Sequence, residues 1–205
     1  MDGGLIMGNV RLYGSTSGYT ELAPPAVAPD GVLVLPSGTG TIAKTTDQGL
    51  AHINTTTFSA VSSVSLNDVF TSDYQTYEIN FRVNDYVTSQ QLQYRFRLSG
   101  TDNTSGAYTC KGSGGGASTV NVNRDNQTIG QFTNNDGPGF FTFRVDSPAL
   151  ATQTRSVSVG MNDNNARVIS MAHLHTGSTA FDGITFIAST GNMSGFVSVY
   201  GYKNS

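Results

Sequence analysis

The sequence predicts an all-β protein, an antiparallel β-sandwich of jelly-roll type preceded by an extended N-terminal segment. Three observations favour this class. Apolar and polar residues alternate without error over residues 77–84 and again over 91–98, and side chains alternate in this way across a strand. Charged residues make up only 12% of the 205 residues, and Gly contributes 24, a composition with few helix formers. Further short strands recur roughly every 8–15 residues between polar turns.

The two alternating stretches are the centre of the predicted fold. One face of each is apolar, and we expect the following residues in the core: Tyr77, Ile79, Phe81, Val83, Leu92, Tyr94, Phe96 and Leu98. The break at 85–90 is about as long as a long hairpin loop. We therefore expect a hairpin in which Glu78 lies across from Arg95 or Arg97.

The remaining strands are expected at 58–66, 119–123, 128–132, 140–145, 155–161, 166–174, 183–188 and 194–202. Two further hairpins follow, one that joins 155–161 to 166–174 and one that joins 183–188 to 194–202. Residues 146–150 favour a corner or one helical turn. We expect a polar linker over 41–54, a main domain that begins near Thr55, and a division into segments 1–50 and 51–205.

The first fifty residues differ in character from the rest. Prolines at 24, 25 and 29 exclude a helix and favour an extended path. An apolar run at 32–35 follows, but a segment of this length cannot build its own core. We expect it to lie against a second copy of the chain or against a host assembly.

The motif NVRLYGSTSGYTELAPPAVA at 9–28, followed by LVLPSGTG at 33–40, resembles an N-terminal module of tail-fibre and other virion proteins of tailed bacteriophages. The stretch VFTSDYQTY at 69–77 and the ending SGFVSVYGY at 194–202 are similar to parts of the β-sandwich heads of such proteins. The resemblance implies attachment to a virion, usually as a homotrimer. We expect the apolar residues of the segment to make this attachment: Leu12, Tyr13, Leu22, Val27, Val32, Leu33 and Leu35.

Three functions remain open at this point. The first is a non-enzymatic homotrimeric fibre or spike whose outward sandwich adheres to a host-surface glycan. The second is a capsid decoration protein that stabilises the head. The third is a carbohydrate-binding or carbohydrate-active protein outside a virion. The net charge of −3 argues against a nucleic-acid partner.

The localisation predicted from the sequence is the virion, after synthesis in the host cytoplasm. Residues 1–7 have neither a basic region nor a long apolar run, so no signal peptide is expected, and Met7 is an alternative start. No apolar stretch is long enough for a transmembrane helix. We expect no cofactor and no membrane insertion.

The predicted sugar-binding residues are exposed amides, a carboxylate and an aromatic ring in loops: Asn103, Tyr108, Asn134, Asn135 and Asp136. Tyr108 is alternatively a core residue. Most other acidic residues stand in predicted turns, and no pair is singled out for glycoside hydrolysis. Cys110, the single cysteine, is expected to be buried rather than catalytic.

Two histidines have a spacing that suits a metal. His173 and His175 are two residues apart on a predicted strand, so both side chains point to the same side. On a three-fold axis, six such imidazoles would suit one iron or zinc ion. The competing interpretation, which we prefer, is that both are solvated at a strand end and bind no metal.

Overall fold

The computed structural model describes residues 10–13, 17, 19–22, 49–86, 91–115, 120–132, 138–162 and 167–203. The chain divides into two compact units, Met1–Ile42 and Ala43–Ser205. The described residues contain strands and turns and no helix.

The first unit contains one antiparallel hairpin. β1 (Val10–Tyr13) pairs with β2 (Tyr19–Leu22), with Val10 opposite Leu22. Three of the predicted attachment residues, Leu12, Tyr13 and Leu22, lie in this hairpin. The other four lie outside the described residues: Val27, Val32, Leu33 and Leu35.

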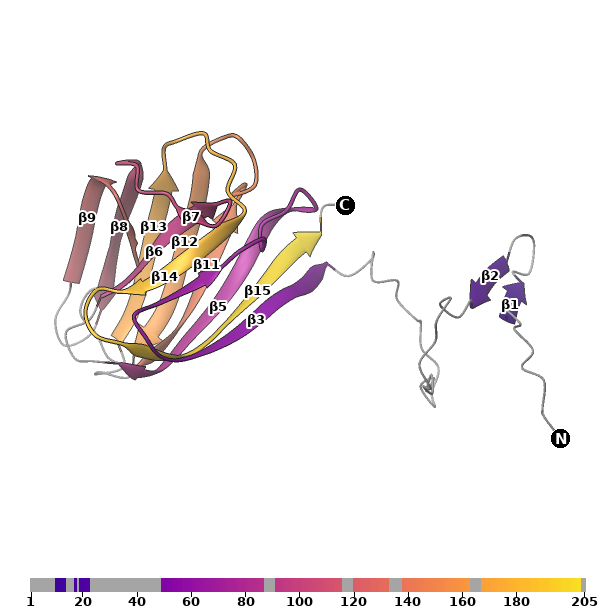
Figure 1. Ribbon diagram of the computed structural model, residues 1–205, viewed down its shortest axis with the longest axis horizontal. Helices are drawn as coiled ribbons and strands as arrows, with labels where there is room; N and C mark the ends of the chain where they lie inside the picture. The colour runs from indigo at the N-terminus through magenta and orange to yellow at the C-terminus, as the bar shows by residue number, and fades with distance from the viewer. Residues whose placement is uncertain are drawn as a thin grey trace. The chain divides into compact units, whose positions relative to one another are not determined.

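The second unit is a two-layer sandwich (Figure 1). Its larger sheet has eight antiparallel strands in the order β3-β15-β5-β11-β12-β13-β8-β9. These strands are β3 (Leu50–Val61), β5 (Tyr74–Tyr86), β8 (Tyr108–Gly115), β9 (Val120–Gln127), β11 (Gly139–Asp146), β12 (Thr154–Asn162), β13 (Arg167–His175) and β15 (Met193–Lys203).

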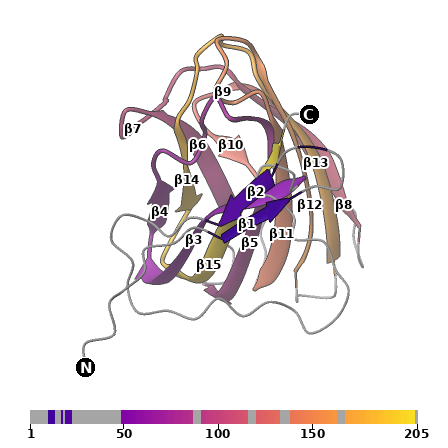
Figure 2. The ribbon, with the colours of Figure 1, turned by 90° about the vertical axis from the view of Figure 1, so that its right-hand side faces the viewer.

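The smaller sheet has five strands in the order β10-β6-β14-β4, with β7 paired to β6. They are β4 (Ser63–Leu66), β6 (Leu92–Leu98), β7 (Thr101–Asp102), β10 (Gly130–Gln131) and β14 (Gly183–Ala188). Figure 2 shows β4, β7 and β14 of this sheet on the left and β8, β12 and β13 of the larger sheet on the right. The predicted antiparallel β-sandwich is confirmed.

An aromatic core fills the space between the sheets. Tyr77, Ile79, Phe81 and Val83 are all buried on the inner face of β5. The ring of Phe81 lies 4.6 Å from that of Phe186 in β14. Strict alternation thus selected the correct buried face of β5, because only one of its faces meets the opposing sheet.

The predicted hairpin between the two alternating stretches is wrong. β5 pairs with β11 and β15, whereas β6 pairs with β7, β10 and β14 in the other sheet. Glu78 therefore lies opposite Arg144 and Tyr200, not opposite Arg95 or Arg97. The prediction that Leu98 lies in the core is also wrong, since this residue is 46% exposed at the end of β6. Alternation shows which face of a strand is buried but not which neighbour it pairs with.

Other connections also cross between the sheets. The expected strand at 58–66 is two strands, because the chain leaves the larger sheet after Val61 and enters the smaller one at Ser63. Ala60, with a φ of 52°, marks the bend. The expected pairing of 183–188 with 194–202 is also wrong, since β14 and β15 belong to different sheets.

Some local predictions hold. The hairpin of β12 and β13 is confirmed, with Val157 opposite Ala172. Residues 147–150 form turns and bends rather than a helical turn. The first strand of the sandwich begins at Leu50, whereas the first strand of the main domain was predicted to begin at Phe58.

Candidate functional site

The two histidines are core residues. Both lie on the inner face of β13, where His173 is 4% and His175 1% exposed. The ring of His173 packs against those of Tyr94 and Phe143, with centroids 5.5 and 5.2 Å away. Burial lowers the pKa of His173 to about 3, and burial is also the main cause that lowers the pKa of His175. Solvated histidines are therefore the wrong interpretation.

The same geometry overturns a shared metal site on a three-fold axis. Such a site needs imidazoles at the surface of each copy, where symmetry-related rings meet. His173 and His175 point between the two sheets of their own sandwich and are covered by aromatic rings, including Phe181 against His175 at 4.9 Å. No group of three or more His, Cys, Asp or Glu in the described part of the chain forms a metal-binding cluster.

Tyr108 is also buried, with no exposed surface, which rules out its predicted role as an exposed platform for a sugar ring. Its hydroxyl donates to the carbonyl oxygen of Asn103 at 3.1 Å and accepts from the backbone N–H of Phe96 at 3.0 Å. Burial is the main cause that raises the pKa of Tyr108. The alternative interpretation, a core tyrosine, is the correct one.

Asn103 shapes a turn beside β8. Its side-chain oxygen accepts hydrogen bonds from the backbone N–H and the hydroxyl of Ser105, at 3.1 and 2.6 Å. The other predicted sugar-binding residues, Asn134, Asn135 and Asp136, lie outside the described residues. Of the two predicted sugar-binding residues that the structure describes, Tyr108 is buried, so Asn103 and Tyr108 do not form a surface site together. Cys110 is buried at 1% exposure, as predicted.

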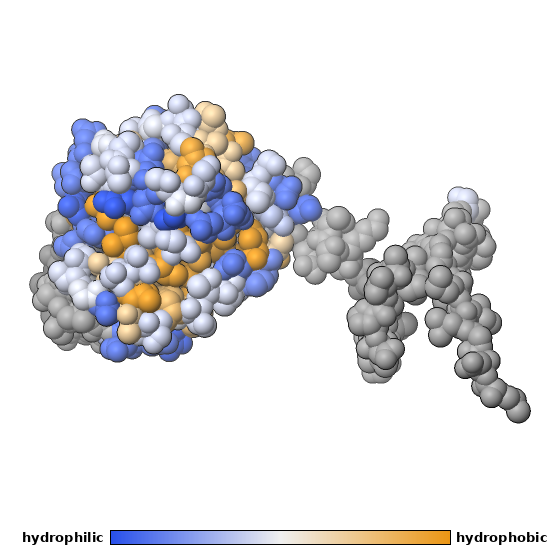
Figure 3. Space-filling model, viewed as in Figure 1, coloured by the Kyte–Doolittle hydropathy of each residue, from blue (hydrophilic) through white to orange (hydrophobic). Residues whose placement is uncertain are grey.

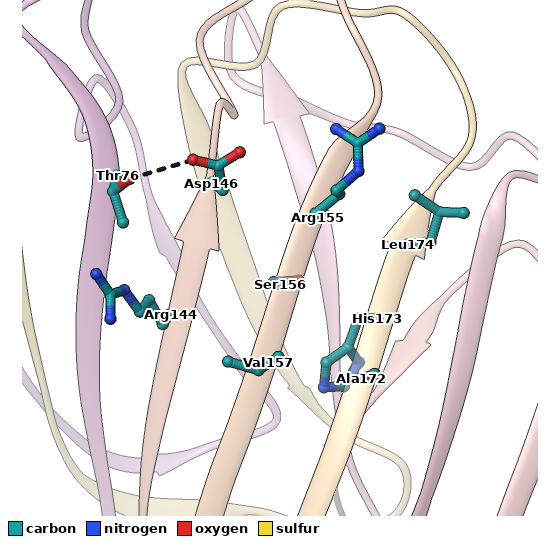
Figure 4. Close-up of a pocket in the computed structure, with 9 residues that line it drawn as sticks. All are labelled: Thr76, Arg144, Asp146, Arg155, Ser156, Val157, Ala172, His173 and Leu174. Atoms are coloured by element: carbon teal, nitrogen blue, oxygen red, sulfur yellow. Dashed lines mark hydrogen bonds between the residues drawn. The ribbon is translucent and has the colours of Figure 1, made fainter.

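The outer face of the larger sheet is hollowed where four of its strands lie side by side. A groove of about 540 Å³ crosses β5, β11, β12 and β13. Figure 4 shows Asp146, Arg155 and Leu174 at one end of the groove and Arg144, Val157 and Ala172 at the other. The strand register accounts for this arrangement, because the pairs Asp146–Arg155 and Arg155–Leu174 are directly opposite one another.

Some polar groups of the groove already contact other residues of the protein. The carboxylate of Asp146 accepts hydrogen bonds from Thr76 at 3.2 Å and Ser147 at 3.1 Å. The guanidinium of Arg144 lies 4.8 Å above the ring of Tyr202. Arg155 is exposed on β12 between Asp146 and Leu174. The groove therefore offers a donor, an acceptor and an apolar floor side by side.

The carboxylates do not converge in this groove. Asp146 is its one acidic lining residue, whereas glycoside hydrolysis in most families uses a pair of carboxylates about 5–10 Å apart. A smaller groove of about 390 Å³ on the same sheet is lined by Arg82, Phe140 and Met161, among others, and includes no carboxylate. Neither of these two grooves brings a pair of carboxylates together among the residues that line it.

Apolar side chains continue from the groove along the outer face. Phe140, Met161 and Val168 lie opposite one another on β11, β12 and β13. Val157 and Val159 join this row to the groove, and all five are between 45% and 55% exposed. We call these five residues the apolar patch. Figure 3 shows the opposite side of the sandwich, where a band of apolar surface is bordered by hydrophilic residues.

The sequence analysis predicted a strand at 155–161 but assigned no inner or outer face to it, and so it missed this surface. The small residues of β12, Ser156 and Ser158, face the core, and Val157 and Val159 face outward. The inner face is crowded: a Cβ added at Gly160 would lie 2.2 Å from the ring of Phe141. The alternation in 155–161 was visible, but the sequence had no signal for which face was inside.

Comparison with known protein families, with curated proteins and with solved structures found no match. The described residues include no helix that is long and apolar enough to cross a membrane.

Proposed function

We propose that the protein is a structural component of a tailed-bacteriophage virion, a homotrimeric fibre or spike that attaches through its N-terminal segment and presents its sandwich outward. One observation carries this proposal. The chain divides into its two compact units between Ile42 and Ala43, close to Gly40, where the resemblance to the virion module ends. A small attachment unit followed by a self-contained head is the organisation that the resemblance implies.

The proposed mechanism is adhesion to a host-surface glycan through the groove on the larger sheet. Sugars present both hydroxyl groups and C–H faces, and they bind where a few polar groups flank an apolar surface. Arg155 and Asp146 supply a donor and an acceptor, and Val157 with Ala172 supplies the floor. Each site is expected to be weak, and presentation by a trimer would raise the overall affinity by about 10²–10⁴.

A glycan array probed with the full-length protein tests adhesion. We expect signal for the wild type, loss with Arg155→Ala and loss with Val157→Glu. Lys203→Ala is the matched control, since this exposed lysine at the end of β15 is outside the groove. Binding that survives both groove substitutions would contradict this role of the groove.

The virion assignment has a separate test. Cross-linking of intact particles followed by mass spectrometry reports what the first 42 residues touch. Cross-links to a tail or baseplate protein support a fibre or spike. Absence of the protein from purified particles would overturn the virion assignment.

A second candidate is a capsid decoration protein, which the apolar patch favours. Contact with another protein is one of the roles that exposed apolar areas have. In that case the first 42 residues or the patch would cross-link to shell subunits. Substitution of Met161 by Lys would then reduce occupancy on the head without unfolding the sandwich.

A further inference from the structure

The outer face of the larger sheet has more guanidinium groups than carboxylates. Strand pairing arranges its side chains in rows that cross β5, β11, β12 and β13. One row contains Asp146 and Arg155, the next contains Glu78 and Arg144, and the row two further along contains Arg82. Two carboxylates and three guanidinium groups therefore share this part of the face.

Both carboxylates already accept hydrogen bonds from the protein. Glu78 accepts from the hydroxyl of Tyr202 at 2.8 Å and from the amide of Asn80 at 3.4 Å. Each oxygen of Asp146 likewise accepts one bond, and the one drawn in Figure 4 comes from Thr76. The acceptors of this face are thus partly used within the sandwich.

The arginines keep most of their donors. A guanidinium group has five N–H donors, and Arg82 uses one of them toward Asn84 at 2.9 Å. Within the part of the chain that the structure describes, Arg144 contacts the ring of Tyr202 and has no hydrogen bond, and Arg155 has neither a hydrogen bond nor an ion pair. The face therefore offers free donors and positive charge, although the whole chain has a net charge of −3.

The arginines lie at the two ends of an apolar floor. Arg155 lines the groove of about 540 Å³, and Arg82 and Met161 line the groove of about 390 Å³. Arg155 and Met161 are six residues apart on β12, which is about 20 Å along a strand. Val157 and Val159 lie between them, and each is about half exposed. The two grooves are thus the ends of one elongated surface.

We infer that this surface binds a linear glycan whose sugars carry carboxylates and which lies along β12, from Arg155 and Arg144 to Arg82. The inference rests on the proposed adhesion and names the class of its ligand. Guanidinium groups bind carboxylates through paired, charge-assisted hydrogen bonds. The valines suit the C–H faces of the sugars between the acid groups. A chain of sugars, unlike a single sugar, reaches both grooves.

The probes are linear oligosaccharides of galacturonate, of mannuronate and of sialic acid, each compared with its carboxyl-reduced, neutral counterpart. Isothermal titration calorimetry with the full-length protein measures the affinities. For at least one series we expect the acidic octasaccharide to bind about tenfold or more tightly than its neutral counterpart at low salt. The difference should shrink as the NaCl concentration rises, because salt screens exposed charges.

Three variants locate the acid groups on the surface. Arg155→Gln should weaken binding of both the acidic disaccharide and the acidic octasaccharide by about tenfold. Arg82→Gln should weaken binding of the octasaccharide alone, because a disaccharide does not extend from one groove to the other. Lys203→Gln is the matched control, since it also removes one positive charge but lies outside both grooves. Circular dichroism checks that all three variants are folded.

The outcomes separate this inference from the proposed adhesion. Equal affinity for the acidic and the neutral oligosaccharides would overturn the acidic ligand and leave adhesion standing. Absence of binding to every oligosaccharide, acidic and neutral, would refute both. Polyglutamate that binds as tightly as the acidic octasaccharide would show attraction of any polyanion and would refute the glycan. A loss with Lys203→Gln as large as that with Arg155→Gln would exclude the assigned surface.

Discussion

The ring nitrogen Nε2 of His173 lies 2.9 Å from the hydroxyl oxygen of Ser158 in the core of the sandwich. The other ring nitrogen, Nδ1, is buried without a hydrogen-bond partner. Because burial lowers the pKa of His173 to about 3, the folded protein holds this imidazole neutral. Protonation therefore favours the unfolded chain.

This relationship predicts a specific dependence of stability on pH. An unfolded histidine titrates near pH 6.5, so the stability due to neutral His173 is fully present above about pH 6.5. It decreases by about 1.4 kcal/mol per pH unit between about pH 6.5 and pH 3. Urea unfolding at a series of pH values measures this slope.

Two variants separate His173 from the carboxylates that titrate in the same range. His173→Leu should unfold with a shallower pH dependence than the wild type. Ser158→Ala should keep the slope and lose stability at every pH, since it removes the hydroxyl and keeps the histidine. Equal slopes for the wild type and His173→Leu would contradict the prediction.

A second prediction concerns the close approach of β12 to β11. Gly160→Ala should destabilise the protein by about 1–3 kcal/mol, because the new Cβ would meet the ring of Phe141 and the carbonyl oxygen of Phe140, 2.6 Å away. The free energy of unfolding in urea measures the effect. Gly49→Ala is the control, since no atom lies within 4 Å of its added Cβ, and an equal loss in both variants would refute the explanation.

A third prediction follows from the buried hydroxyl of Tyr108. Tyr108→Phe leaves the N–H of Phe96 without its partner, and this should cost about 1–3 kcal/mol of stability. Tyr202→Phe, which removes a hydrogen bond to Glu78 on the outer face, should change stability by about 0.5 kcal/mol or less. Thermal or urea unfolding of both variants measures these changes in stability. A Tyr108→Phe variant as stable as the wild type would show that the hydroxyl is dispensable.

A fourth prediction tests which face of β12 is buried. Val159 is 52% exposed and Ser158 is 2% exposed. Val159→Thr should therefore be nearly neutral, within about 0.5 kcal/mol, whereas Ser158→Val should cost about 1–3 kcal/mol, because the larger side chain crowds His173. If the order of the two effects were reversed, the assignment of the inner face would be wrong.

The burial pattern of some strands was predictable from the sequence. In β5 the residues from Tyr77 to Val83 alternate between large apolar and polar side chains, so only one choice of face buries the apolar set. The hairpin of β12 and β13 was predictable as well, since a short polar loop separates two short strands. In both cases the information is local.

Candidate site residues were less predictable. Asn103 and Tyr108 had the residue types of a sugar site, but the fold uses them to fix a turn against the core. Arg155 and Asp146 belong to no recognisable sequence motif. They lie side by side only because β11 and β12 pair in this register. A surface that spans four strands has no contiguous signature in the chain.

The sequence by itself determined the all-β class and the buried face of strands such as β5, because alternation and composition act over a few neighbouring residues. Only the tertiary structure decided which strands share a sheet and which face of β12 is inside. These depend on contacts between residues far apart in the chain. On the inner face of β12 the ring of Phe141 lies so close that Gly160 has no room for a side chain, and the small residues Thr154, Ser156 and Ser158 are buried while the valines face outward.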